Sequence, residues 1–597
     1  MSTQRAYTII GIMFISVLLL RLPEAPTPIF GVDEAHYAVI ASTILDGGMI
    51  YRDSFEHKGP ITHFLTALIF FLFGRNNMTA LHVAVIGMVL LITLILFQIC
   101  RRIDPSLRTG CWAVGFMSIF SYTYPKQDMF IFQSEWVAAV FTSLGAYILI
   151  RSIFTERPFS LVWSGLFYGL AFLTKQTTLL DFGVALGLLV LQPFFIGTHK
   201  LEILKSVGWM LLGFVLVVGL MVAYFYAHQA LNDFWFGFWE YNMNYYMAKV
   251  SWGGRIASAL ATVISDPDSY LQVNFLLLLL FVSGFCVNVY QLVQNQRKDA
   301  TDWVNLFLVG WGVSSYLEAS FSGRNFGYYY IIILPAFCLV SAQVTETILI
   351  DLSTLKDKTE EVNTAFSKGK KGHYTGFPSV FSKEKASKSL FKGLTLQGQD
   401  PCQRGHLREL KIFVLTVFLW GMTSPLATYV GERKIWRFYL GQKMYSHHVS
   451  AELKMLIDYM RQNSRKEDKI FVWGFYEDIY VLAERKPASR YINCLALTGY
   501  IPEKEGKPLS STRGTIVPGS WDILMEELRT QRPLFIVDTS FGHNTLYDRQ
   551  RRYGHYPLEQ FERLYNFLQE HYFLDREFFF QSRPTFRLFK RKLATDT

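Results

Sequence analysis

Long apolar segments recur along most of this chain, and they constrain its fold more than any other feature. Up to about residue 430, runs of about 16 to 23 mainly apolar residues alternate with short polar connections. A helix of about 20 such residues crosses the hydrocarbon core of a bilayer. Because hydrophobic residues make up 51% of the sequence and charged residues only 18%, we expect a polytopic α-helical membrane protein.

The predicted spans number eleven, and their boundaries are 7–22, 79–99, 110–124, 136–154, 159–174, 178–196, 205–227, 270–292, 303–319, 329–350 and 411–428. The first run lacks a small-residue cleavage site, so we expect a retained helix and not a signal peptide. The apolar segment 61–73 is too short to cross, and we predict a helix lying at the outer membrane surface. Counting that segment as a span would invert the orientation of everything after it.

Basic residues mark one side of the predicted membrane domain. If the N-terminus is cytoplasmic, the connections on the cytoplasmic side carry Arg101, Arg102, Arg108, Arg151, Arg157, Lys200, Lys205, Arg297 and Lys298. The positive-inside rule favours this orientation, and an odd number of spans then places the C-terminal part outside. The net charge of +10 is explained by these loops, so nucleic-acid binding is not expected.

The sequence predicts four parts: a membrane domain with outer loops at 1–350, a basic flexible cytoplasmic loop at 351–410, the last span at 411–428, and an outer-face α/β domain at 429–597. In the α/β domain, short apolar runs predict buried strands at 468–474 and 532–540, and apolar residues at helical spacing predict helices at 451–462, 521–531 and 557–572. The six cysteines form no cluster with each other or with histidine, so neither a disulfide framework nor a structural zinc site is expected.

Ionisable and aromatic residues of the membrane domain gather on the side opposite the basic loops. They include Asp33, Glu34, Lys58, Asp128, Glu135, Lys175, Glu318 and Arg324, with the aromatic run 234–246 and Tyr328–Tyr330. Charged groups at a membrane boundary cost free energy unless they are paired or hydrated, which makes them candidates for one functional cleft. Plainer explanations stay open: a first-turn acidic pair at 33–34, lysines that extend to the interface, and an aromatic belt.

Several segments resemble the polyprenyl-phosphate-sugar-dependent glycosyltransferases of the GT-C class. VDEAHYAVIASTILDGGMIYRD and EHKGPITHFL resemble the first outer loop of that class, which includes protein O-mannosyltransferases, aminoarabinose transferases and rhizobial galacturonosyltransferases. Further resemblance covers most of the chain, in FQSEW, SGLFYGLAFLTKQT, DFWFGFWEYNMNYY, SGRNFGYYYIIILPA and DKIFVWGFYEDIYVLAERKPASRYI. Two departures are Lys58-Gly59-Pro60, where relatives often have Lys-Pro-Pro, and Tyr328-Tyr329, where they have His-Tyr.

This resemblance implies a GT-C fold and a sugar transfer in which the donor is linked through one phosphate to a polyprenol. Asp33 would be the general base, with Glu34 orienting it or binding acceptor. Lys58, Lys175 and Arg324 would stabilise the leaving phosphate. Acceptor or sugar binding would fall to Asp128, Glu135, Tyr245, Tyr328 and Tyr329. No cofactor is required, and a divalent cation, Mg²⁺ or Mn²⁺, stays open.

The sequence therefore predicts a glycosyltransferase of the plasma (inner) membrane, with its active site on the periplasmic or extracellular face. Its expected partners are a polyprenyl-phosphate sugar, membrane lipids, and a glycan, lipid or protein acceptor. The alternative is a transporter or flippase of lipid-linked sugars. A transporter would carry ionisable residues near mid-membrane and internal repeats or broken helices, and the sequence shows neither.

Overall fold

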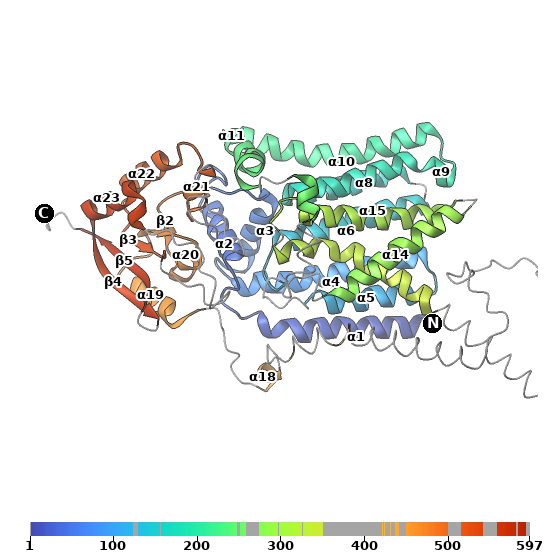
Figure 1. Ribbon diagram of the computed structural model, residues 1–597, viewed down its shortest axis with the longest axis horizontal. Helices are drawn as coiled ribbons and strands as arrows, with labels where there is room; N and C mark the ends of the chain where they lie inside the picture. The colour runs from blue at the N-terminus through green and yellow to red at the C-terminus, as the bar shows by residue number, and fades with distance from the viewer. Residues whose placement is uncertain are drawn as a thin grey trace, which may run out of the picture.

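A bundle of long helices and a smaller mixed domain at one end of it make up the structure (Figure 1). It is a computed structural model, and it describes residues 2–122, 129–155, 157–247, 251–257, 274–295, 298–324, 326–349, 421, 423, 430, 436–440, 449–499, 515–540, 558–580 and 583–592. The predicted cytoplasmic loop 351–410 lies outside the described residues, as does nearly all of the predicted span 411–428.

Six described helices are long and apolar enough to cross a membrane: α1 (Thr3–Arg21, continuing to Glu24), α4 (Met78–Ile103), α6 (Ser134–Thr155), α10 (Lys200–Ala227), α14 (Phe275–Gln294) and the helix Gly327–Leu349. They coincide with six of the predicted spans. Shorter or more polar helices take the places of four more: α5 (Arg108–Phe120), α7 (Leu161–Thr174), α8 (Leu179–Leu191), which α9 (Pro193–Ile196) extends, and α15 (Ala300–Ser320).

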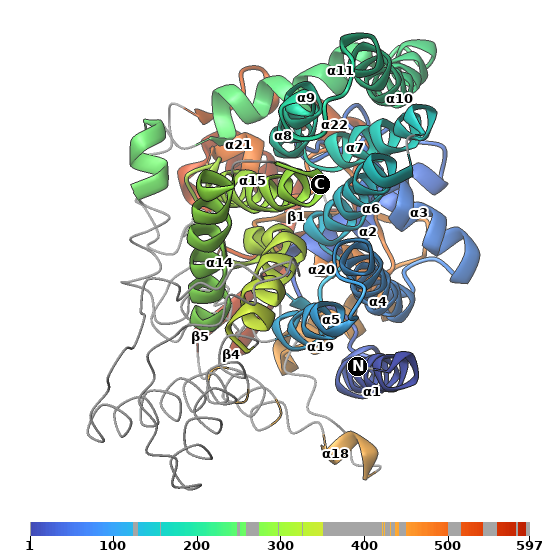
Figure 2. The same ribbon diagram turned by 90° about the vertical axis from the view of Figure 1, so that its right-hand side faces the viewer.

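The long helices lie side by side, and Figure 2 views them end on. Helix α6 is mostly buried within the bundle, whereas α10 lies at its edge and is largely exposed. Helices α7 and α10 approach closely because a glycine lies where they meet: a Cβ atom at Gly165 would come within 1.8 Å of the carbonyl oxygen of Met210. Small residues at such crossings let two helices pack backbone to backbone.

Short elements cover the end of the bundle that faces the mixed domain (Figure 1). They are α2 (Val32–Leu45), α3 (Pro60–Phe73), α11 (Leu231–Trp235), the π-helices η5 (Phe236–Glu240) and η6 (Asn242–Tyr246), and the 3-10 helix η7 (Gly327–Ile333). Helix α3 has only 14 residues, as the sequence predicted for segment 61–73, and Pro60 opens it at a position where no backbone donor is needed.

The C-terminal domain holds a five-stranded sheet in the order β2-β1-β3-β5-β4. Its strands are β1 (Lys469–Trp473), β2 (Lys486–Pro487), β3 (Phe535–Asp538), β4 (Tyr572–Phe580) and β5 (Arg583–Arg591). Strand β1 pairs in parallel with β2 and β3, whereas β5 is antiparallel to both β3 and β4. Its helices are α19 (Ala451–Gln462), α20 (Asp478–Ala483), α21 (Leu495–Thr498), α22 (Ser520–Gln531) and α23 (Glu562–His571).

The predicted strands at 468–474 and 532–540 are confirmed as β1 and β3, and the three predicted helices as α19, α22 and α23. The sequence reasoning missed the final hairpin of β4 and β5. Its pairing is irregular, with register shifts between Leu574 and Arg576 and between Phe578 and Phe579. A bulged strand loses strict alternation of inward and outward residues, which is the signal that predicts a strand.

The two domains share contacts. The backbone N–H of Phe55, in the loop after α2, donates to the carbonyl oxygen of Arg490 at 2.9 Å. The ring of Phe55 lies 5.7 Å from that of Tyr491 in the C-terminal domain and 5.0 Å from that of Tyr241 in the bundle. This apolar core crosses the junction, so the loops at the end of the bundle are held by both domains.

Candidate active site

Helix α2 begins at Val32 and places Asp33 in its first turn, where the helix dipole favours a carboxylate. One oxygen of Asp33 accepts a hydrogen bond from Lys58 Nζ at 2.8 Å, and the other accepts one from Gln133 Nε2 at 3.3 Å. Burial raises the pKa of Asp33, but the Lys58 ammonium, with His36 and Gln133, outweighs burial and holds that pKa below its usual value. Asp33 is therefore an ionised carboxylate facing a cation.

The loop that carries Lys58 lies against the end of helix α7. A Cβ atom at Gly59 would come within 2.1 Å of the carbonyl oxygen of Leu173, so only glycine fits there. On the other side, one carboxylate oxygen of buried Glu56 accepts hydrogen bonds from the backbone N–H groups of His57 and Lys58, at 2.6 and 2.9 Å. This packing gives a steric reason for the departure from the Lys-Pro-Pro pattern.

The Lys58 ammonium lies between two acceptors. Besides its bond to Asp33, Nζ donates to the hydroxyl of Tyr37 at 2.7 Å and lies 4.7 Å from the centre of that ring. Burial lowers the pKa of Lys58, but Asp33, Tyr37, Glu56 and Glu135 together outweigh burial and raise that pKa well above its usual value. Lys58 is therefore a fixed positive charge.

A second pair joins the start of α6 to the end of α7. Lys175 Nζ donates to Glu135 Oε1 at 2.7 Å and lies 4.4 Å from the centre of the Tyr329 ring. The hydroxyl of Tyr329 is 3.0 Å from that of Tyr246. Two ammonium groups, two carboxylates and a pair of phenols thus come from elements far apart in the sequence.

Arg324, just after α15, lies against the π-helix η6. Its Nε and Nη2 donate to the carbonyl oxygen of Tyr246 at 3.0 and 2.7 Å, and its guanidinium lies 5.0 Å from the centre of the Tyr246 ring. A π-helix has a wider backbone turn than an α-helix and is frequent at functional sites. Here it brings Tyr246 to both Arg324 and Tyr329.

Lys58, Glu135, Lys175, Tyr246 and Tyr329 line a cavity of about 190 Å³. Asp33 and Arg324 are not part of its lining, and each contacts a residue that is: Asp33 contacts Lys58, and Arg324 contacts Tyr246. The polar lining also includes Glu318. The apolar lining includes Leu179, Leu180, Phe238, Trp239 and Met243. A small cavity with cations at one wall and an apolar surface at another suits an amphiphilic anion.

Comparison with known proteins agrees with the glycosyltransferase class expected from the sequence. Residues 57–226 match the family model described as dolichyl-phosphate-mannose-protein mannosyltransferase. ArnT from Cupriavidus metallidurans bound to undecaprenyl phosphate matches in fold with a TM-score of 0.53, at 12% identity, over 98% of this chain and 98% of that chain. Its apo state gives a TM-score of 0.51 at 12% identity, over 100% and 99%.

The predicted resemblance to GT-C glycosyltransferases is confirmed. The fold is that of a multi-pass membrane protein, and family model and fold agree with the predicted glycosyltransferase. The apo oligosaccharyltransferase from Archaeoglobus fulgidus is more distant, with a TM-score of 0.49 at 12% identity over 90% of this chain and 70% of that chain. No curated protein matches the sequence. The matched range 57–226 includes Lys58, Glu135 and Lys175, whereas Asp33 and Arg324 lie outside it.

Glu34, predicted beside Asp33 in the site, points elsewhere. Its side chain is fully buried, accepts a hydrogen bond from the backbone N–H of Phe30, and lies 3.2 Å from His82 Nε2 in helix α4. Successive residues of a helix point about 100° apart, and here Asp33 faces Lys58 whereas Glu34 faces His82. Glu34 therefore holds the start of α2 against α4.

The remaining side chains predicted to bind sugar or acceptor differ in where the structure places them. Tyr328 is partly exposed and stacks on Phe326, and its ring lies 4.8 Å from that of Tyr329. Tyr245 stacks on Tyr241 and joins the apolar core of the domain junction, away from the cavity. Asp128 lies outside the described residues.

A buried cluster around Glu56 is the main feature that sequence reasoning missed. Glu56 Oε2 lies 3.1 Å from His36 Nε2 and 2.9 Å from His63 Nε2. On its other face, His36 Nδ1 is 3.2 Å from Glu477 of the C-terminal domain. Burial lowers the pKa of His36, but the two carboxylates outweigh burial and raise that pKa to about 10. A charged His36 thus connects the Lys58 loop to the C-terminal domain.

A sequence signal for this cluster existed, because His36, Glu56, His57 and His63 all fall in the first predicted outer loop. Among the residues that the structure describes, no group of three or more His, Cys, Asp or Glu side chains could hold a metal ion. These residues therefore offer no set of ligands for the Mg²⁺ or Mn²⁺ ion that the sequence left open.

Proposed function

We propose that this protein transfers a sugar from a polyprenyl-phosphate donor to an acceptor hydroxyl on the outer face of the membrane. The observation that carries the proposal is the convergence of the Asp33–Lys58 and Glu135–Lys175 pairs beside one cavity that also has an apolar wall. A base, two cations and an apolar surface are what transfer from a lipid phosphate requires.

In the proposed reaction, the acceptor oxygen attacks the anomeric carbon and the bond from that carbon to the phosphate oxygen breaks. The leaving polyprenyl phosphate takes the electron pair of the broken bond, and Asp33 takes the proton of the acceptor hydroxyl. The half-buried Asp33 reaches Lys58 at 2.8 Å, so base and phosphate site are adjacent. Because base, acceptor and donor would be held next to each other, the reaction would not need a collision of three separate groups in solution.

Donor binding would also change the strength of the base. Without donor, the Lys58 ammonium neutralises Asp33 and lowers its pKa. A donor phosphate competes for the same ammonium, because charge-assisted hydrogen bonds to phosphate are strong. When Lys58 turns to the phosphate, Asp33 loses a stabilising cation and becomes a better proton acceptor.

The phosphate site would combine Lys58 and Lys175, which both line the cavity, with Arg324, which contacts Tyr246. Charge grows on the phosphate oxygens as the sugar leaves, and cations already in position stabilise that charge more than they stabilise the donor. The apolar wall near Phe238 and Trp239 would hold the first isoprene units. Glu135, Tyr328 and Tyr329 would contact the sugar or acceptor.

The membrane arrangement is part of the proposal: eleven spans, a catalytic membrane domain at 1–350, a cytoplasmic loop at 351–410 and an outer domain at 429–597 in the plasma (inner) membrane. Figure 1 supports it, because the mixed domain lies at the same end as α2 and α11, opposite the chain's N-terminus. The arginines at the end of α4, Arg101 and Arg102, favour the cytoplasm for the opposite end.

The orientation can be tested with single cysteines introduced at Lys454 and at Arg102, both exposed in the structure. We expect a membrane-impermeant maleimide to label the Lys454→Cys variant in intact cells and to label the Arg102→Cys variant only after lysis. The parent chain, which keeps its own cysteines, gives the background. The reverse pattern would place the C-terminal domain in the cytoplasm and remove the proposal of an outer-face site.

The proposed activity itself is tested with the full-length protein in detergent and labelled polyprenyl-phosphate sugars. We expect the protein to release polyprenyl phosphate and to pass the label to an acceptor from the cell envelope, or slowly to water when no acceptor is present. A donor that is moved across vesicle membranes without being cleaved would instead favour the lipid-transport alternative.

A further inference from the structure

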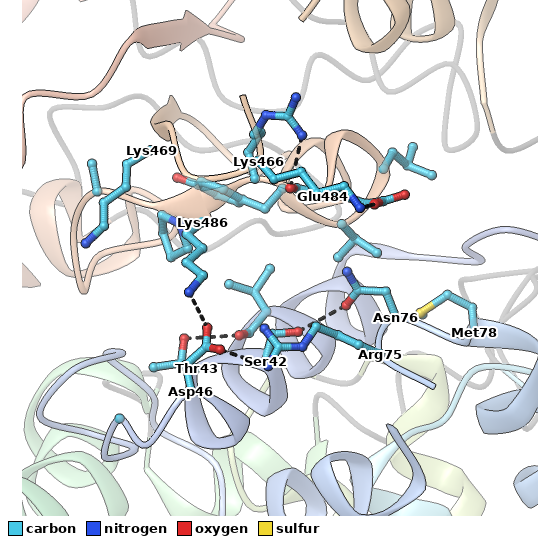
Figure 3. A pocket seen from close by; sticks show the side chains of 18 of the residues that line it. Ser42, Thr43, Asp46, Arg75, Asn76, Met78, Lys466, Lys469, Glu484 and Lys486 are labelled. Carbon is cyan, nitrogen blue, oxygen red and sulfur yellow. Dashed lines mark hydrogen bonds and ion pairs between the residues drawn. The ribbon is translucent and has the colours of Figure 1, made fainter. Parts of the chain in front are cut away.

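A second, larger hollow lies between the C-terminal domain and the far end of helix α2, away from Asp33 (Figure 3). It has a volume of about 1180 Å³. Its lower wall is the end of α2 and the turn before α4, including Ser42, Asp46 and Asn76; its upper wall is the C-terminal domain. We refer to it below as the interdomain cleft.

Positive charge exceeds negative charge by two along this cleft: its lining has seven cationic side chains, Arg75, Arg461, Lys466, Lys469, Arg485, Lys486 and Arg490, and five carboxylates, Asp46, Asp53, Glu467, Glu484 and Glu527. Asp46 is shared by two cations, Arg75 at 2.8 Å and Lys486 at 3.0 Å. On the upper wall Glu484 is likewise shared by Arg461 at 2.9 Å and Lys466 at 3.6 Å. Each of these carboxylates can neutralise one positive charge, so each cluster keeps a surplus.

Two further cations of the cleft bind neutral groups. Lys469 Nζ donates to the amide oxygen of Gln531 at 2.7 Å. Arg485, only 7% exposed, donates to the hydroxyl and carbonyl oxygens of Ser464 at 2.9 and 2.8 Å and to the carbonyl oxygen of Ala483 at 2.9 Å. Hydrogen bonds to neutral acceptors satisfy these donors but leave their charge, which attracts anions into a concave surface.

The rest of the lining suits sugar hydroxyls. Side chains with hydroxyl or amide groups come from both walls: Ser42, Thr43, Asn76, Asn77, Ser489 and Gln531. Such groups donate and accept hydrogen bonds equally well, as a saccharide requires. A lipid headgroup would need an adjoining apolar groove for its chains, whereas most of the residues that line this cleft are polar or charged.

We propose that the interdomain cleft binds acidic groups, phosphate or carboxylate, on a part of the acceptor saccharide remote from the hydroxyl that reacts. The proposal rests on the function proposed above. Asp46 lies 13 residues after Asp33 along α2, a rise of about 20 Å at 1.5 Å per residue. A distance of several sugar units separates the two sites, so an extended anionic acceptor reaches both, and the cleft selects acceptors by charge.

The test measures binding to full-length protein in phosphatidylcholine nanodiscs. The probe is fluorescent hexagalacturonate, and neutral maltohexaose is its uncharged counterpart. We expect hexagalacturonate to bind, its affinity to fall with added salt, and the Lys466→Glu/Lys469→Glu variant to bind about tenfold or more weakly, because it reverses two cleft charges. Neither substitution breaks the Arg461–Glu484 or Lys486–Asp46 pair.

The matched control is Lys454→Glu/Arg529→Glu, which reverses two exposed charges of the same domain outside the cleft and is expected to bind like the parent chain. Equal binding of maltohexaose, no binding of hexagalacturonate by the parent, or unchanged binding by the double variant would overturn the proposal. Displacement of hexagalacturonate by soluble short-chain phosphatidylglycerol, but not by short-chain phosphatidylcholine, would show that lipid headgroups occupy the cleft, and would overturn it too.

A second measurement in the same samples distinguishes failure of the cleft proposal from failure of the proposed function. It follows the cleavage of a labelled polyprenyl-phosphate sugar by water when no acceptor is present. Cleavage by the parent chain together with unchanged oligosaccharide binding in the double variant argues against the cleft alone. Absence of cleavage argues against the proposed function, while the binding data still decide whether the cleft takes an anionic saccharide.

Discussion

Replacing Asp33 with asparagine is expected to slow sugar transfer by about 10²- to 10⁴-fold, the usual contribution of a general base. The amide oxygen of asparagine can still accept the bond from Lys58 that Asp33 Oδ1 accepts at 2.8 Å, so the local geometry should survive. The amide cannot take a proton from the acceptor hydroxyl. Transfer of labelled sugar from a polyprenyl-phosphate donor, under single-turnover conditions, measures this loss.

Two comparisons make that result specific. Asp522→Asn makes the same chemical change at a side chain that is 77% exposed on the C-terminal domain, and it is expected to leave transfer unchanged. Donor affinity should be kept or increased in the Asp33→Asn variant, because Lys58 no longer has a carboxylate to neutralise it. Transfer at the parent rate would remove Asp33 from the role of base, and loss of donor binding would indicate a binding role instead.

The membrane half of the fold could be predicted from the sequence because the bilayer fixes the length of its elements. Helices such as α4 and α10 satisfy a length and hydropathy rule that depends on local sequence alone. Length alone does not separate segment 61–73 from spans, because α3 has 14 residues and so has α7, which takes the place of a predicted span. The rule does not predict which helices pack together, since contacts such as that of Gly165 with α10 depend on shape at a crossing.

The candidate site could be predicted as a set of residues but not as pairs. Charge bias placed Lys58, Glu135 and Lys175 on one side, and the structure brings them together. Which carboxylate meets which ammonium depends on how α2, α6 and α7 pack, and sequence spacing does not carry that information. For Glu34 the information was present, because the 100° step of a helix separates it from Asp33.

The link from the Glu56 cluster to the C-terminal domain could not be predicted for a different reason. Its partner Glu477 belongs to the C-terminal domain, and no local pattern links that residue to His36 across more than four hundred positions. The cluster holds the backbone of the Lys58 loop through Glu56 Oε1, so the C-terminal domain supports the geometry of the site. The sequence pattern of either domain alone does not show this connection.

Replacing Lys58 with methionine is expected to lower the rate of transfer by about 10²- to 10³-fold, as for loss of one preorganised group that stabilises developing charge. The same change should also move the acidic limb of the pH–rate profile to higher pH. Lys58 lowers the pKa of Asp33, and without it burial is left to raise that pKa. Because the base must be ionised, activity is lost at a higher pH as the solution is acidified.

Lys175→Met separates these two effects. Lys175 bonds to Glu135 at 2.7 Å and not to Asp33, so its loss should lower the rate while the acidic limb stays in place. Lys454→Met, an exposed lysine of the C-terminal domain, controls for loss of a positive charge in general. Profiles of kcat/KM from pH 4 to 8 compare all four proteins. An acidic limb that does not move in Lys58→Met would mean that Asp33 is not the titrating base. A limb that moves in Lys58→Met alone would mean that Lys58 both sets the pKa of the base and stabilises the leaving phosphate.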